Sequence, residues 1–189
     1  EDFIERHADE PFLLFYPMAL VHSPFEPTPH SASRDADKQS NFADMMAYMD
    51  AVVGRVVARL DELGLRDNTV VIFTSDNGGA MRHGAVNAPL RGGKGSTFEG
   101  GIRAPTIAWW PGRIQAGAVS DEPLAAYDWM STACELAGLP EPKLTDGLSF
   151  VPTLLGKEQP PHAHLFWSYG AKKAVRMGKW KAVVPRDAA

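Results

Sequence analysis

The sequence has very little cysteine, no long apolar run and no excess of positive charge. Its one cysteine, Cys134, cannot form a disulfide within the chain, so no disulfide framework exists. The apolar run from Phe12 to Leu20 is interrupted by Pro17 and is too short to span a bilayer. With 19 Lys and Arg against 23 Asp and Glu, the net charge of −4 gives no electrostatic reason to expect nucleic acid or an anionic membrane as a partner.

The first residues also lack an initiating methionine and any secretion signal. Glu1 to Arg6 contain neither a basic region nor an apolar one. We therefore expect the sequence to begin inside a longer protein. Its 189 residues, 44% hydrophobic and 22% charged, are typical of a folded domain with a small appendage.

The clearest local pattern is an amphipathic helix between residues 41 and 63. Apolar residues, including several methionines, recur there every three or four positions, which is typical of a helix face that packs in a core. Asn41, with Asp44 three residues later, resembles an N-cap followed by an acidic first turn. Gly64 suits the position just after the helix.

Three short segments are rich in β-branched or aromatic residues and apolar on both faces, which predicts strands of a parallel sheet. These segments are 11–17, 69–74 and 105–110. A second helix is expected over 124–138 and a helical turn near 150–155. Alternating residues beyond them predict three short antiparallel strands. Those strands are 165–169, 173–177 and 180–184. The order predicts an α/β sandwich, a mostly parallel sheet flanked by helices, with a small antiparallel β piece at the C-terminal end.

Polar residues follow the strand predicted over 69–74. Ligands gather at the carboxyl ends of strands in open α/β sheets, and Asp76 and Asn77 lie at such an end. Carboxylate and amide oxygens are hard ligands that suit Ca²⁺ or Mg²⁺. Asp-Asn-Gly is also a common turn sequence. The local sequence therefore leaves both a turn and a metal site open.

Two other segments carry residues suited to oxyanion chemistry. His22 could protonate a leaving group or bind an anion, and the plain alternative is a surface histidine. The segment 91–101 is rich in glycine, which lets backbone approach an anion, and Lys94 adds a point charge. Gly95 stands where a nucleotide-binding P-loop has Ser or Thr, so we exclude that motif. The alternative is a flexible loop, although Glu99 and Arg103 are spaced to pair and fix it.

Several motifs in one order, over about residues 11–184, resemble the type I sulfatases. They are YMDAVVGR from Tyr48, LDELGL from Leu60, NTVVIFTSDNG from Asn68, PLRGGKGSTFEGGIRAP from Pro89, DGLSF from Asp146, LLG from Leu154 and AVRMGKWK from Ala174. The resemblance implies an alkaline-phosphatase-like α/β fold and hydrolysis of sulfate esters. It also implies that residues 1–140 belong to the catalytic domain and that 141–189 begin a small C-terminal subdomain.

The resemblance also implies roles for individual residues. Asp76 and Asn77 resemble two ligands of the active-site Ca²⁺, with Mg²⁺ as the alternative metal. Lys94 resembles the lysine that contacts the sulfate group. His22 resembles the histidine that binds sulfate near the bridging oxygen and helps the leaving alcohol depart. His83, between the two motifs, is a further substrate-binding candidate.

The sequence departs from this family in its nucleophile. Type I sulfatases make a formylglycine from the first residue of Cys/Ser-x-Pro-x-Arg, and no such motif occurs here. Cys134 is followed by Glu-Leu-Ala, and we interpret it as a packing residue. The family's two other aspartate ligands and its Lys/His pair precede the region that this sequence resembles. We therefore expect a C-terminal portion of a sulfatase that is inactive alone.

The alternatives are a phosphonate or phosphate ester hydrolase of the same superfamily, or a non-catalytic remnant that binds an oxyanion or another chain. Exposed sheet edges would favour self-association or pairing with the missing N-terminal portion. The expected partner is a sulfated small molecule or sulfated glycan, with neither nucleic acid nor membrane. The family resemblance suggests a periplasmic or secreted protein.

Overall fold

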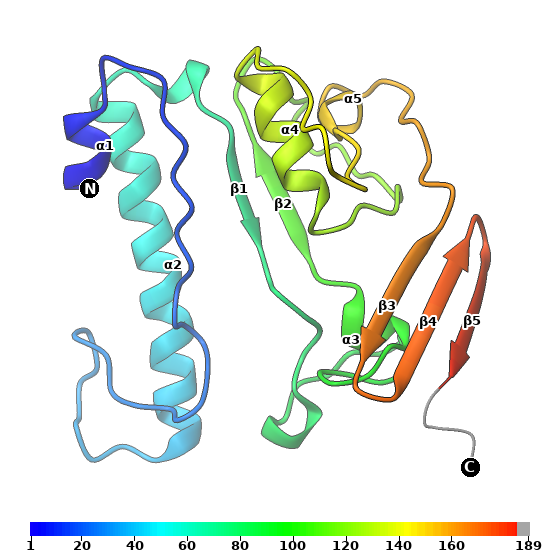
Figure 1. Ribbon diagram of the computed structural model, residues 1–189. Coiled ribbons are helices and arrows are strands. Elements are labelled where there is room, and N and C mark those ends of the chain that lie inside the picture. Colours follow the sequence, from blue (N-terminus) through cyan, green and yellow to red (C-terminus); the bar gives the residue numbers. More distant parts are fainter. Residues whose placement is uncertain (185–189) are drawn as a thin grey trace. The chain divides into compact units, whose positions relative to one another are not determined.

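A computed structural model describes residues 1–184 and divides the chain into two compact units (Figure 1). Unit 1 comprises Glu1–Thr69, and unit 2 begins at Val70. No helix in residues 1–184 is both long and apolar enough to cross a membrane. The boundary expected near residue 140 stays a prediction.

Unit 1 is built on the predicted long helix. This helix, α2 (Lys38–Glu62), begins three residues before the predicted start, and it buries Met45, Val52 and Leu60 as the stripe predicted. The N-cap is Asp37, not Asn41: its side chain accepts hydrogen bonds from the backbone N–H groups of Gln39 and Ser40 at 2.8 and 2.9 Å. The short helix α1 (Asp2–Arg6) lies beside α2 (Figure 1). A short 3-10 helix, η1 (Arg66–Asn68), follows the C-terminal end of α2.

The strand predicted over residues 11–17 is wrong. The structure assigns no strand to this segment, and the Phe15 side chain is 84% exposed. A strand needs a neighbouring edge with which to exchange backbone hydrogen bonds. The regular elements that the structure describes in unit 1 are all helical, so the segment has no such edge there.

Unit 2 contains the two other predicted strands, but they do not run parallel. Strands β1 (Val71–Thr74) and β2 (Thr106–Trp109) pair antiparallel, with Thr74 opposite Thr106. The segment between them returns to the end of the sheet that it left, and its α-helix, α3 (Glu99–Ile102), has only four residues. The prediction of a mostly parallel sheet is therefore wrong for every strand pair in residues 1–184.

The predicted antiparallel piece is confirmed. Strands β3 (Leu165–Tyr169), β4 (Lys172–Met177) and β5 (Trp180–Val184) form one sheet in that order. Helices α4 (Asp128–Leu136) and α5 (Val151–Leu154) precede it, at the positions of the predicted helix and helical turn. The buried Asp128 carboxylate accepts a hydrogen bond from the Leu148 N–H at 2.9 Å, which ties the segment before α5 to α4.

Candidate active site

The first candidate residues, Asp76 and Asn77, lie directly after β1. The Asn77 amide donates a hydrogen bond to Asp76 Oδ1, so the two side chains touch. The Ser75 hydroxyl donates to the Asn77 backbone oxygen at 2.9 Å and fixes the turn. The segment is therefore a turn that places a carboxylate and an amide side by side, and its role as a metal site stays a prediction.

The glycine-rich segment 91–101 packs against this turn through its backbone. The Gly78 N–H donates to the Gly101 oxygen at 2.9 Å, and the Lys94 N–H donates to the Gly79 oxygen at 3.1 Å. A Cβ atom on Gly78 would stand 1.8 Å from the Gly100 oxygen, so only glycine permits this approach. The contact brings Lys94 to the same end of β1 as Asp76 and Asn77.

Asn87 connects the same two segments and was not predicted. Its Oδ1 accepts a hydrogen bond from the Gly79 N–H at 2.9 Å, and its Nδ2 donates to the oxygens of Gly79 at 3.0 Å and Gly92 at 3.2 Å. One amide thus satisfies three backbone groups of two loops. An asparagine before Ala-Pro gives no sign of this role, because the bonds depend on how the loops meet.

The predicted Glu99–Arg103 ion pair is wrong. Glu99 instead pairs with Lys181 at 2.6 Å and with Arg176 at 3.7 Å. Arg103 pairs with Asp121 at 3.5 Å. The glycine-rich segment is still fixed by charge, but its partners come from the C-terminal sheet, about 80 residues further along the chain.

His83 and Lys94 are both exposed. His83 ends the turn η2 (Met81–His83), where its N–H donates to the Ala80 oxygen at 2.8 Å. It lies in the segment that joins the Asp76–Asn77 turn to the glycine-rich loop. Its assignment to substrate binding stays a prediction.

His22 belongs to unit 1, in an exposed loop that α2 anchors. The buried Asn41 amide donates to the Phe25 oxygen at 3.1 Å, and the rings of Phe25 and Phe42 are 5.1 Å apart. His22 Nδ1 is 2.7 Å from the Ser23 oxygen. A carbonyl oxygen only accepts, so Nδ1 carries the proton of the neutral ring.

The donor set of the Asp76–Asn77 turn fits part of a Ca²⁺ site. Both side chains offer hard oxygen ligands from adjacent positions, whereas Ca²⁺ takes 6–8 oxygens. Residues 1–184 contain no cluster of three or more His, Cys, Asp or Glu side chains able to hold a metal. These two residues therefore fit as members of a larger ligand set. In such a site, the Asn77 amide would present Oδ1 to the ion in place of its present bond to Asp76.

Comparison with known proteins gives one consistent result. A family model described as Sulfatase matches residues 1–139. The chain is 37% identical to the N-acetylgalactosamine-6-sulfatase of Canis lupus familiaris, across 96% of this chain and 36% of that protein. It is 40% identical to arylsulfatase A of Homo sapiens, across 94% of this chain and 36% of that protein. The chain thus spans about a third of the length of the curated relatives it matches.

Two solved structures are also similar to this chain. The crystal structure of Ps i-CgsB in complex with k-i-k-neocarrahexaose superposes with a TM-score of 0.82 at 31% identity, across 96% of this chain and 43% of that one. The phosphonate monoester hydrolase of Agrobacterium radiobacter superposes with a TM-score of 0.60 at 26% identity, across 78% of this chain and 33% of that one.

Proposed function

This chain belongs to the sulfatase family, and we propose that it supplies one side of the active site of a metal-assisted sulfuric ester hydrolase. The observation that carries the proposal is the packing of the Asp76–Asn77 turn against the loop of Lys94, through the Lys94–Gly79 and Gly78–Gly101 hydrogen bonds. The two oxygen ligands suit a divalent cation, and that cation together with the Lys94 side chain would suit an anionic group such as a sulfate ester.

Each residue has a distinct task in this proposal. Lys94 binds an oxygen of the sulfate group and offsets the negative charge that develops there. His22 binds near the bridging oxygen, and in its imidazolium form it gives the Nε2 proton to the departing alcohol. His83 adds a contact to the substrate. Asp76 and Asn77 would hold Ca²⁺, or Mg²⁺ in its place, which when bound supplies Lewis-acid stabilisation of the sulfuryl oxygens.

The nucleophile of the proposed reaction lies outside these residues. The sequence contains no Cys/Ser-x-Pro-x-Arg motif, so the formylglycine would come from polypeptide beyond the 189 residues. The Ps i-CgsB structure contains a neocarrahexaose, and human arylsulfatase A is named for aryl sulfates. We accordingly propose a sulfated glycan or a sulfated small molecule as the substrate class, and a periplasmic or secreted location.

The test compares two lysine substitutions in the intact protein that contains this chain. Lys94→Met should lower kcat/KM for 4-nitrophenyl sulfate by about 100-fold or more, which is the cost of removing one charge-stabilising donor. Lys157→Met removes the same charge from an exposed position of unit 2 and should leave kcat/KM unchanged. Near-normal hydrolysis by the Lys94→Met variant would contradict the proposal.

A second candidate function is phosphonate or phosphate ester hydrolysis, because a metal and a lysine would serve either anion. The superposition on a phosphonate monoester hydrolase favours this candidate. The same preparation should hydrolyse 4-nitrophenyl sulfate faster than a phenyl phosphonate monoester. The reverse preference would support the second candidate, and inactivity towards both esters would support a non-catalytic remnant.

A further inference from the structure

We propose that the C-terminal sheet holds Lys94 in its working position, with Lys172 as the positioning residue. This inference rests on the proposed function. Lys172 lies at the start of β4, and its Nζ donates a hydrogen bond to the Gly95 backbone oxygen at 2.5 Å. Gly95 directly follows Lys94, so the bond fixes the carbonyl group of the residue next to Lys94.

The Lys172 side chain is itself held in place. Its Nζ lies 5.5 Å from the centre of the Tyr169 ring, on the strand opposite, where Tyr169 pairs with Lys172. The same ring approaches Gly95, where an added Cβ would stand 3.8 Å from Tyr169 Cε1. Gly95 has a φ of +83°, a conformation that favours glycine. The turn between β3 and β4 therefore contacts the loop at one defined residue.

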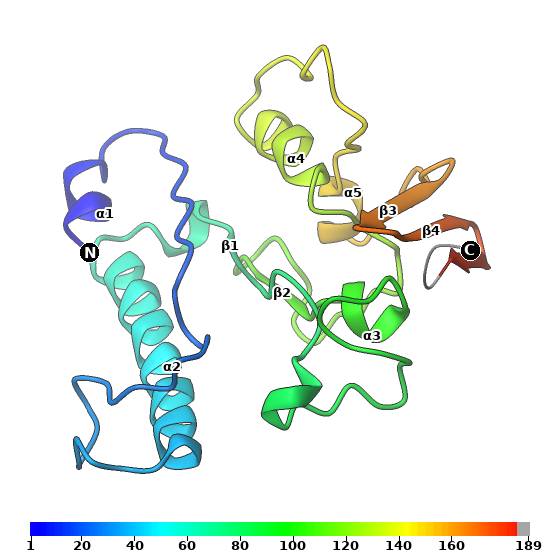
Figure 2. The same ribbon diagram turned by 60° about the horizontal axis from the view of Figure 1, so that its bottom comes forward.

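A second contact fastens the far end of the loop to the same sheet. Glu99, the first residue of α3, pairs with Lys181 of β5 at 2.6 Å and with Arg176 of β4 at 3.7 Å. Lys181 also lies 4.8 Å from the centre of the Trp167 ring. Arg176 and Lys181 are opposite each other in the β4–β5 register, and both side chains at such a pair point to one face. Figures 1 and 2 show α3 beside this sheet.

These contacts leave the two residues Lys94 and Gly95 hydrogen-bonded at both ends of their backbone. On one side, the Lys94 N–H donates to Gly79, in the segment that follows Asp76 and Asn77. On the other side, the Gly95 oxygen accepts from Lys172. A glycine-rich loop loses much conformational freedom when it is ordered, so it needs such bonds to present one geometry. A small displacement of a charge-stabilising group costs a large factor in rate.

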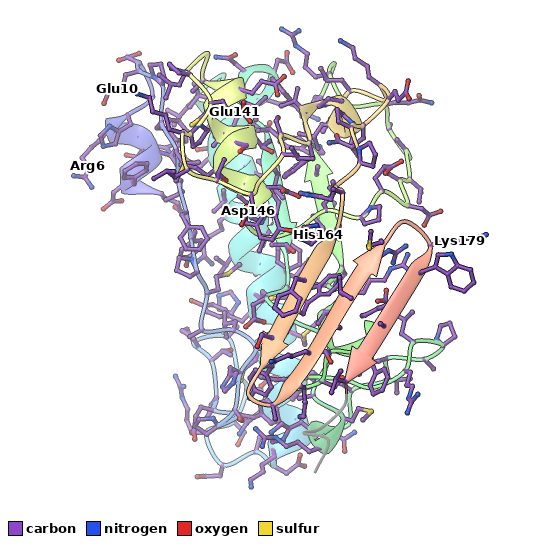
Figure 3. All side chains as sticks on the ribbon, turned by 45° about the vertical axis from the view of Figure 1, so that its right-hand side comes forward. Arg6, Glu10, Glu141, Asp146, His164 and Lys179 are labelled. Atoms are coloured by element: carbon purple, nitrogen blue, oxygen red, sulfur yellow. The ribbon has the colours of Figure 1, made fainter. Side chains whose placement is uncertain are left out.

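Neighbouring lysines provide matched controls. Lys173 is adjacent to Lys172 but points to the opposite face of β4, where it is exposed. Lys179 lies at the turn between β4 and β5, at the other end of the strand (Figure 3). Removing either charge changes the net charge as Lys172→Met does, but it leaves the Gly95 bond in place.

The experiment uses the intact protein and two measurements. Lys172→Met should raise the hydrogen–deuterium exchange of residues 91–98 several-fold and lower kcat for 4-nitrophenyl sulfate about 10-fold, with a smaller change in KM. Lys172→Arg keeps a hydrogen-bond donor and a positive charge, so its exchange of residues 91–98 and its kcat should both lie close to those of the wild type. Lys173→Met should match the wild type in both the exchange of residues 91–98 and kcat.

The two measurements separate the possible failures. Unchanged exchange in Lys172→Met, or a kcat no lower than that of Lys173→Met, would overturn the positioning role. A loss of kcat that Lys172→Arg does not restore would also overturn it, because the donor would then not be the cause. A wild-type protein that hydrolyses no sulfate ester would overturn the proposed function, whereas the exchange measurement would still decide whether Lys172 orders the loop.

Discussion

Asp37 begins α2 through two hydrogen bonds, from the backbone N–H groups of Gln39 and Ser40. The bonds from Ser40 and then Gln39 lower the pKa of the Asp37 carboxyl below 3.8, because they stabilise its charged form. A depressed folded-state pKa means that the charged cap stabilises the fold above the unfolded pKa. That stability is lost as the pH falls through the folded-state pKa.

Two substitutions of Asp37 separate capping from charge. Asp37→Ala should lower the thermal midpoint of unit 1 by a few degrees at pH 7, and the difference from wild type should shrink as the pH falls below about 4. Asp37→Asn retains an acceptor and should keep most of the midpoint at every pH. Circular dichroism melts of the three proteins across pH 2.5–7 provide the measurement. If the thermal midpoints of Asp37→Ala and wild type differed by the same amount at pH 2.5 and at pH 7, the charge of Asp37 would not contribute to the stability of the cap.

At the scale of single residues, the sequence offers candidates where the signal is a local motif, and their chemical roles stay predictions. Asp76, Asn77 and Lys94 were identified as chemistry-bearing residues, and the structure brings their segments together. Asn41 was mistaken for the N-cap because an asparagine before an apolar run fits that role, whereas its amide binds the distant Phe25 oxygen. The sequence around Lys172 does not indicate its contact with the loop, because its hydrogen-bond partner, the Gly95 oxygen, is 77 residues away.

At the scale of elements, periodicity predicts where a helix or strand lies in the sequence, but it does not predict in which direction two strands pair. The α2 stripe repeats every three or four residues, so the helix could be predicted within three residues at its start. The β1 and β2 segments were identified within two residues of their bounds. Their relative direction depends on the path of the chain between Thr74 and Thr106. An apolar composition on both faces of a strand does not encode that path.

Gly78 and Gly100 bring two loops of unit 2 into close contact. Gly78→Ala should destabilise unit 2 by about 3 kcal/mol, because its Cβ would overlap the Gly100 oxygen and force two backbones apart. Gly54→Ala is the matched control: Gly54 lies in the middle of α2 with nothing within 4 Å of the added Cβ, so the change should stabilise α2 by about 0.5–1 kcal/mol. Urea unfolding of both variants measures these effects, and a neutral Gly78→Ala would show that the loops do not meet as described.

At the scale of the whole molecule, apolar surface remains exposed in both units. Phe15 in unit 1 is 84% exposed, and Ile107 on β2 of unit 2 is 64% exposed. Burying such side chains stabilises an assembly by about 1.5–3 kcal/mol each. This surface supports the proposal that the 189 residues act together with further polypeptide, and it gives the self-association alternative a physical basis.

The nucleophile provides the last prediction. With Asp76, Asn77 and Lys94 but no Cys/Ser-x-Pro-x-Arg motif, the 189-residue polypeptide should show no multiple turnover of 4-nitrophenyl sulfate, even with saturating Ca²⁺. The intact protein should turn the ester over, and Cys134→Ala in it should keep kcat within about twofold, because Cys134 lies half-buried on α4 and serves packing. If the isolated 189 residues turned the ester over and Cys134→Ala abolished that turnover, Cys134 would be the nucleophile. That result would contradict the formylglycine nucleophile proposed for this protein.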